Sequence, residues 1–253
     1  MKKTFLGLTL VATTLLTVTV STQTAEAALS EETDVGIGFS QDGEGTGPYK
    51  NNLNIVKYPK SFDFGQANEA AAGQIFNAKP MKNSEGTARA KYLAVFDDRS
   101  DKETESNGWK LTAQLTDLEN KADSTKQDKL NGKMTMTFTN PKDYLIKDMN
   151  QENTDYIIPD PSLPESSKPL DDTKKAQYDF SKIENNAKIE LPIGGSSVDI
   201  MGAKDGEVDK KAVRGGVLTD VENIQLHVSN KASDDAKYSG KVKWALSTAY
   251  QAV

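Results

Sequence analysis

The chain has 253 residues, no cysteine, one histidine and a formal net charge of −6 at pH 7. The missing cysteines exclude disulfides and a lipid-carrying cysteine, and with a single histidine they argue against zinc, haem or iron–sulfur sites. The acidic balance disfavours nucleic acid as a partner, because a negative surface repels phosphate groups. We therefore expect no cofactor and no metal site.

The first 27 residues have the pattern of a cleavable signal peptide. Met1-Lys2-Lys3 is positively charged, Phe5 to Val20 is apolar but rich in threonine, and Ala25-Glu26-Ala27 is a small-x-small cleavage site. The apolar stretch is shorter than the roughly 20 residues that a membrane-spanning helix needs. The pattern predicts export, cleavage after Ala27, no membrane association afterwards, and one mature domain over residues 28–253.

Beyond the signal peptide, apolar and polar residues alternate with period two, which is typical of half-buried strands. Strands are predicted over residues 53–58, 92–96, 109–115, 134–139, 188–193, 224–228 and 238–246. Asn140-Pro141 is expected to end the fourth of them, and the best helix candidate is Ala67 to Phe76. Many short strands with turn-rich connections predict an all-β fold, an antiparallel sandwich or barrel with long polar loops.

Several connections have a composition of their own. Residues 36–47 are glycine-rich, Glu119 to Asn131 has the charge of an exposed hairpin loop, and Gly194-Gly195 and Gly215-Gly216 indicate turns. Residues 155–175 are rich in proline and aspartate and cannot form a central strand, because each proline lacks a donor for the ladder. A linker between two domains is one interpretation of this segment. A surface excursion within one domain is favoured, since the flanking strand signals are too few for two cores.

Both tryptophans occur in the pattern Trp-x-Leu, as Trp109-Lys110-Leu111 and Trp244-Ala245-Leu246. The first follows Leu93 to Arg99 and a polar loop, and the second closes the block that begins at Tyr238. Together with the upstream blocks 53–59 and 62–65, these features resemble the WxL-domain surface proteins of low-GC Gram-positive bacteria. The resemblance runs from about residue 53 to the end and departs in the proline-rich middle and in the tail 247–253.

The resemblance implies a secreted, extracellular protein that attaches non-covalently to the cell wall through a C-terminal WxL domain. Peptidoglycan would be the ligand, and other cell-surface proteins are implied as further partners. Covalent anchoring is not expected, because Leu163 to Ser167 and Leu191 to Gly195 only echo a sortase signal and precede no hydrophobic tail.

On a strand, Trp and Leu two positions apart share one face, which is usually the buried one. The favoured interpretation makes both tryptophans core anchors that are neighbours across one sheet. The alternative makes them ligand contacts, since indoles stack well on sugar rings. Gly108 and Gly240 precede the two motifs and would let another backbone approach closely. The candidate residues, as a ligand-binding or core motif, are Gly108, Trp109, Leu111, Tyr238, Gly240, Trp244 and Leu246.

Other polar clusters carry weaker signals. Asp97 to Asp101 gathers three carboxylates but lacks the spacing of a calcium loop, so a solvated loop with an internal arginine pair is expected. His227 is expected on the polar side of a strand, and no motif supplies a nucleophile or selects a pair of catalytic acids. The sequence therefore predicts a non-enzymatic wall-binding protein. An adhesive component that binds another surface protein or a host ligand is the alternative, and a secreted glycan hydrolase is the least favoured.

Overall fold

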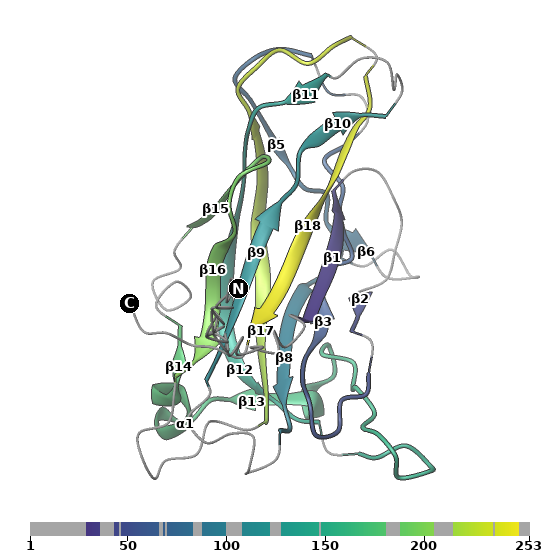
Figure 1. The fold of residues 1–253 in the computed structure, drawn as a ribbon, viewed down its shortest axis with the longest axis vertical. Helices are drawn as coiled ribbons and strands as arrows, with labels where there is room; N and C mark the ends of the chain where they lie inside the picture. The colour runs from purple at the N-terminus through teal and green to yellow at the C-terminus, as the bar shows by residue number, and fades with distance from the viewer. Residues whose placement is uncertain are drawn as a thin grey trace, which may run out of the picture.

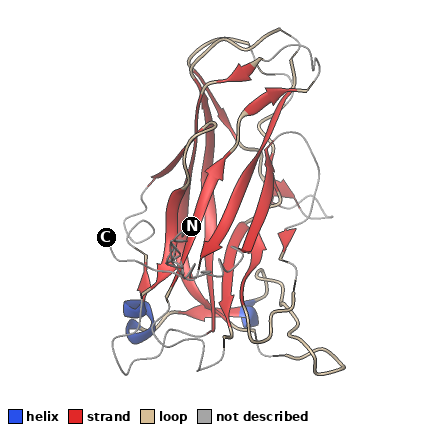
Figure 2. Ribbon diagram, viewed as in Figure 1, coloured by secondary structure: helices blue, strands red, loops and turns tan. Residues whose placement is uncertain are grey.

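The computed structural model describes residues 29–35, 43–45, 47–65, 68, 70–82, 88–99, 108–121, 128–146, 148–180, 188–204, 215–234 and 236–247. They form two packed β-sheets with helical turns only at one end (Figures 1 and 2), which confirms the expected all-β, mostly antiparallel sandwich. No helix among these residues is long and apolar enough to cross a membrane. The predicted signal peptide, residues 1–27, lies outside the described residues.

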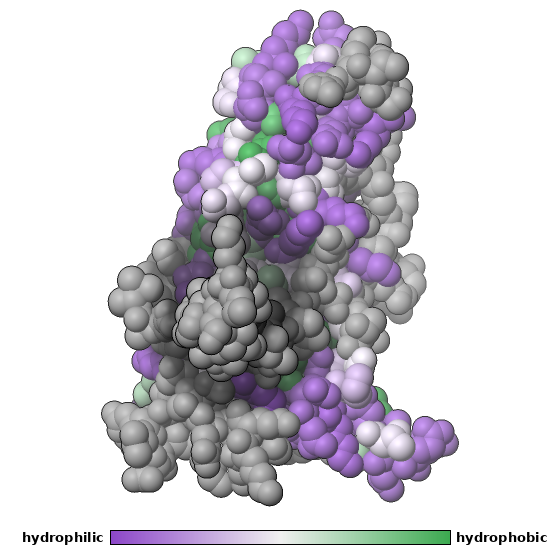
Figure 3. Space-filling view, viewed as in Figure 1, coloured by the Kyte–Doolittle hydropathy of each residue, from purple (hydrophilic) through white to green (hydrophobic). Residues whose placement is uncertain are grey.

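Sheet A holds both Trp-x-Leu strands, β9 and β18, side by side. β18 lies between β1 on one edge and β9, continued by β10, on the other. The strands are β1 (Leu29–Val35), β4 (Ser61–Phe62), β9 (Trp109–Leu115), β10 (Leu118–Asn120), β11 (Lys129–Leu130), β14 (Tyr178–Asp179), β16 (Val198–Ala203) and β18 (Tyr238–Ser247). The pairing of β10 with β11 confirms a hairpin within the range expected as an exposed loop, Glu119 to Asn131, but Asn120 and Leu130 are buried in its strands. Hydrophilic residues gather on the surface at this end of the molecule (Figure 3).

Sheet B is built around two long strands, β12 and β17, which pair along most of their length. On the edge of β17 that faces away from β12, β8 and β5 pair one after the other along the strand. On the opposite edge of β12, β15 and β13 pair in the same way. The strands are β2 (Gly43–Glu44), β3 (Leu53–Tyr58), β5 (Gln74–Asn77), β8 (Lys91–Asp97), β12 (Gly132–Tyr144), β13 (Ser167–Pro169), β15 (Lys188–Pro192) and β17 (Gly215–Val228). A separate ribbon pairs β6 (Met81–Lys82) with β7 (Ala88–Arg89).

The two long strands differ from the sequence expectation. β12 does not end at Asn140-Pro141 but continues through a bulge, where Asn140 has a φ of 51° and the ladder shifts register. A bulge tolerates proline because its extra residue needs no ladder hydrogen bond. Gly215 and Gly216 are not a turn but the start of β17. A Cβ on Gly216 would lie 2.5 Å from the carbonyl oxygen of Tyr144, so only glycine fits between its neighbouring strands.

The helix expected over Ala67 to Phe76 is wrong where the structure describes it, because Gln74–Asn77 form strand β5. Ala67 itself lies outside the described residues. The described α-helix is α1 (Asp172–Gln177), which begins within the proline-rich segment. Asp171 caps it, since the Asp171 carboxylate accepts a hydrogen bond from the Lys174 backbone N–H at 2.7 Å.

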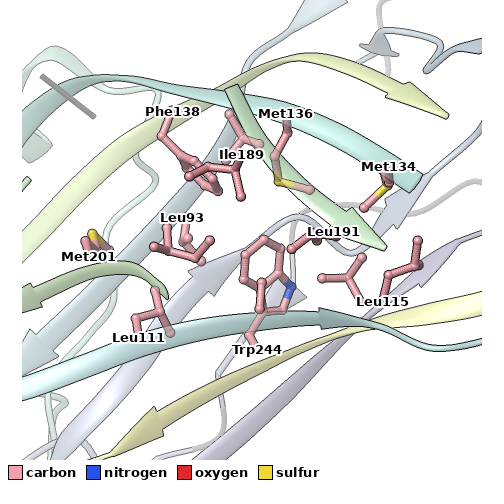
Figure 4. Packing of buried hydrophobic residues seen from close by; sticks show 14 of the residues in the cluster. Leu93, Leu111, Leu115, Met134, Met136, Phe138, Ile189, Leu191, Met201 and Trp244 are labelled. Atoms are coloured by element: carbon pink, nitrogen blue, oxygen red, sulfur yellow. The ribbon is translucent and has the colours of Figure 1, made fainter. Parts of the chain in front are cut away.

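The main core fills the space between the two sheets. Alternation places one face of β9 in it, so Trp109, Leu111, Ala113 and Leu115 are buried while the residues between them are half-buried. Figure 4 shows Trp244 pointing into this space among leucine, isoleucine, methionine and phenylalanine side chains from both sheets. The tight interior agrees with a chain that must fold without disulfides.

A second, smaller core lies on the outer face of sheet B, where the proline-rich excursion packs against it. Its buried members are Val56, Tyr92, Ala94, Phe96, Tyr144, Ile146 and Leu218. The Tyr156 ring packs edge-on against Phe96, with ring centroids 5.3 Å apart, and the Tyr144 hydroxyl donates to the Pro159 carbonyl. The excursion thus covers part of this outer face, and a 3-10 turn (Pro164–Ser166) leads from it into the edge strand β13.

Candidate functional site

The two Trp-x-Leu motifs meet across neighbouring antiparallel strands. Leu246 lies opposite Leu111, and Trp244 lies opposite Ala113. Because the strands run in opposite directions, the two tryptophans flank the leucine pair on opposite sides. On its other edge β9 pairs with β16, where Trp109 lies opposite Ala203. Each indole therefore has an alanine as a cross-strand neighbour, and the small methyl group leaves room for the large ring.

Both motifs point into the core in this structure. Trp109 is 1% exposed and Trp244 is 0% exposed, and Leu111 and Leu246 are buried with them. Trp244 packs edge-on against Phe138 of sheet B, with ring centroids 6.4 Å apart, and Trp109 packs in the same way against Tyr178 at 6.1 Å. Trp244 thus joins the two sheets, whereas the ring partner of Trp109 lies in β14 of the same sheet. A role for these residues in ligand binding stays a prediction.

Trp109 leaves one polar group unsatisfied. Its indole Nε1 is buried and has no hydrogen-bond partner in the described part of the chain. Tyr178, which packs edge-on against the indole, stacks in turn on Phe180, with ring centroids 5.1 Å apart. Burial raises the pKa of the Tyr178 hydroxyl, with a smaller contribution from nearby Asp143. Tyr178 and Phe180 come from a short Tyr-x-Phe alternation at 178–180, which is too short to predict a strand from the sequence.

The residues between and beside the motif positions point the other way, to the outer face of sheet A. We define the outer motif face as Lys110, Thr112, Gln114, Lys241, Lys243, Ala245 and Ser247. Lys241, Lys243 and Ser247 are exposed, and the others are half-buried. Lys110 forms an ion pair with Asp199 at 3.1 Å, and the Gln114 amide donates to the Gly195 carbonyl at 2.8 Å.

Gly240 and Tyr238 lie at the start of β18, before the second motif, and both make close contacts within the fold. Gly240 faces the bend between β9 and β10, and a Cβ there would lie 2.6 Å from the Asp117 carbonyl oxygen. This agrees with the expectation that Gly240 permits a close backbone approach. The Tyr238 hydroxyl donates to Asp128 and accepts from the Ser233 backbone N–H, and burial together with the Asp128 bond raises its pKa. Gly108 is buried directly before Trp109.

The carboxylate loop is only partly as expected. Asp97 and Arg99 do form the internal pair, with the Asp97 carboxylate accepting from Arg99 Nη2 at 2.7 Å and from Nε at 2.9 Å. The pair is not solvated, however, since Asp97 is 1% and Arg99 7% exposed. Asp98 accepts from the Asn51 backbone N–H at 2.9 Å, and Asp101 lies outside the described residues. Within the described residues no group of three or more His, Cys, Asp or Glu could hold a metal ion.

The part of the outer face of sheet B that the excursion leaves uncovered carries a polar network across β15, β12, β17 and β5. Lys133 pairs with Glu190 at 2.6 Å, and Lys188 donates to Gln225, which donates in turn to Asn77. His227 lies in this network, 3.4 Å from the Thr135 hydroxyl, on the polar side of its strand. Partial burial and the two nearby lysines lower the pKa of His227.

Comparison with known proteins gives one match. A family model described as WxL domain, surface cell wall-binding, matches residues 30–249. No curated protein and no solved structure matches the chain.

Proposed function

The chain belongs to the family of WxL surface cell wall-binding domains, and on that basis we propose that it is an exported, non-enzymatic protein held on peptidoglycan without a covalent link. The family match covers most of the chain, which corrects the expectation of a strictly C-terminal domain. Attachment to the cell wall at the cell surface follows from the family. Peptidoglycan as the ligand, export by residues 1–27 and the absence of catalysis belong to the proposal.

The burial of both tryptophans is the observation that decides where the wall would be contacted. A side chain with 0–1% exposure cannot touch a large polymer while the sandwich stays folded. The two motifs would then have a structural role, which is to hold β9 and β18 next to each other in sheet A. Wall contact would pass to the opposite side of the same strands, the outer motif face.

The outer motif face offers an open strand surface with basic side chains. Lys241 and Lys243 project from β18, and neighbouring positions such as Thr112 carry small side chains. The ladder places the two lysines opposite Asp34 and Glu32 of β1. Small side chains leave a strand surface open to a flat polymer, and lysines attract the carboxylates of wall peptides. The outer face of sheet B is less open, because the excursion packs against part of it. Elsewhere on that face Lys133 pairs with Glu190, and Lys188 donates to Gln225.

The test is sedimentation of the purified protein with Gram-positive peptidoglycan sacculi. The variant Lys241→Glu/Lys243→Glu alters the outer motif face, and Lys133→Glu/Lys188→Glu makes the same change of net charge on the outer face of sheet B. We expect the wild type and the sheet B variant to sediment and the outer-motif variant to stay in solution, with all three equally folded by circular dichroism. Wild type that sediments no more than a control protein of equal charge would refute wall binding.

Two further outcomes of this assay are informative. Equal binding by both double variants would leave wall attachment standing and remove the outer motif face as its site. Release of soluble sugar fragments from the sacculi during incubation would contradict the non-enzymatic proposal and favour a glycan hydrolase.

A further inference from the structure

We propose that edge strand β5 pairs with β5 of a second copy of this chain, which extends sheet B through a weak two-fold dimer. The proposal concerns Gln74–Asn77 and does not depend on wall binding. It rests on three features of this strand: its lack of charge and proline, its outward backbone groups and its exposed isoleucine.

β5 is the unguarded edge of the sandwich. Exposed edge strands commonly carry charges or prolines that prevent pairing with another chain. The other edge strands of three or more residues in the described structure follow this rule. β1 contains three acidic residues, β13 contains a lysine and a proline, and β15 contains a lysine, a glutamate and a proline. β5 has the sequence Gln-Ile-Phe-Asn, with neither a charge nor a proline.

The ladder with β17 leaves backbone groups of β5 pointing outward. Phe76 lies opposite Leu226, and just beyond the strand the Ala78 N–H donates to the Ile224 carbonyl at 2.9 Å. In an antiparallel ladder, residues that bond to the partner strand alternate with residues whose N–H and C=O groups face away. The alternation therefore turns the backbone groups of Ile75 and Asn77 away from β17. The structure pairs β5 with no strand other than β17 among the described residues.

A two-fold axis through Phe76 would satisfy these groups. Ile75 would lie opposite Asn77 of the partner subunit and Asn77 opposite Ile75 of the partner subunit, giving four backbone hydrogen bonds. The strand is compatible with itself because no like charges would face each other across the new pair. Ile75 is 54% exposed and would lose part of its contact with water, while Phe76 would stay packed against the core.

The expected dimer is weak. Four residues on each side bury far less than the roughly 1,200 Å² of a standard protein interface. Such an association has its main effect when both copies are confined to one surface, since two linked contacts then act together.

The test measures the weight-average mass of the purified protein by sedimentation equilibrium across a concentration series up to about 1 mM, where a dimer with a millimolar Kd becomes populated. Ile75→Lys places a charge on the edge. Ile157→Lys is the matched control, because Ile157 is 52% exposed but lies on the excursion. Asn77→Asp adds a like charge on each copy and keeps an acceptor for the Gln225 amide.

We expect the wild type and Ile157→Lys to move towards the mass of a dimer as concentration rises, and both β5 variants to stay monomeric with unchanged melting temperatures. Wild type that stays monomeric over the whole series would overturn the proposal. Self-association that is unchanged in both β5 variants would overturn it equally. Because no sacculi are present, neither outcome bears on wall attachment.

Discussion

Replacing Trp244 by alanine tests whether the second motif is a structural element. The Trp244 side chain is fully buried, and a buried tryptophan removes about 150–250 Å² from water. At about 25 cal/mol per Å² this corresponds to roughly 4–6 kcal/mol. Alanine keeps a small part of that area, so we expect a loss of about 3–5 kcal/mol in the free energy of unfolding. The loss is large beside the total stability of about 5–15 kcal/mol typical of a domain.

The assay is urea denaturation followed by far-UV circular dichroism, which does not depend on the tryptophan removed. Trp244→Phe should lose less, because a phenyl ring can still contact Phe138. Lys243→Ala, on the exposed side of the same strand, is the control and should change stability by no more than about 0.5 kcal/mol.

The binding result separates the two interpretations of the motif. Under conditions where Trp244→Phe is folded, it should sediment with sacculi as the wild type does. If Trp244→Ala were within about 1 kcal/mol of the wild type, the reasoning from burial would be refuted. Binding lost by Trp244→Phe at unchanged stability would instead place the indole in the ligand site.

Three further predictions have defined directions. Thr139→Val should raise the free energy of unfolding by about 1 kcal/mol in urea titrations, because the Thr139 hydroxyl is buried without a partner in the described structure. Thr219→Val should lower it, because it removes a 2.8 Å hydrogen bond from the Thr219 hydroxyl to the Thr139 carbonyl. The single histidine, His227, should titrate below about 6.5 when followed by proton NMR. Because the pKa of His227 is lower in the folded protein than in the unfolded chain, its contribution to stability is complete above the unfolded pKa. That contribution is lost as the pH falls through the folded pKa. A measured pKa of His227 above that of the unfolded chain would contradict this prediction. Arg99→Met should lower the free energy of unfolding by about 3–5 kcal/mol, because it leaves the buried Asp97 carboxylate without its ion-pair partner. Adding Asp97→Leu should recover much of this loss. Equal stability of the single and the double variant would argue against a buried pair.

Complete period-two alternation made β9 predictable to the residue, because each apolar residue of Trp109 to Leu115 faces the same core. β3 also occupies the expected range, although Val56 breaks its alternation and faces the second core, because Pro59 ends its apolar run. β16 was missed for the opposite reason. A register shift between Asp199 and Met201 places Ile200 and Met201 both in the buried class, which breaks the alternation.

The candidate site was predictable only in part. The alternation indicated that each Trp and Leu share a face, but not that Leu111 would lie opposite Leu246 with an alanine beside each indole. Register depends on bends and bulges far from the motif, and Gly240 fits the bend before β10 only in the folded sheet. Burial of the Asp97 pair likewise depends on segments that approach from elsewhere in the chain.

The position of β18 determines when the domain can fold. It is the last described strand, yet it lies inside sheet A, between β1 from the other end of the chain and β9 from the middle. β1 and β9 therefore cannot be joined into one sheet until β18 is available. The entropic cost of closing the long loops between these strands is met only at that stage. In a chain that emerges N-terminus first, from a ribosome or through a membrane pore, sheet A cannot close before residues 238–247 have emerged. Sheet A therefore stays open for as long as β18 remains inside the ribosome or the pore.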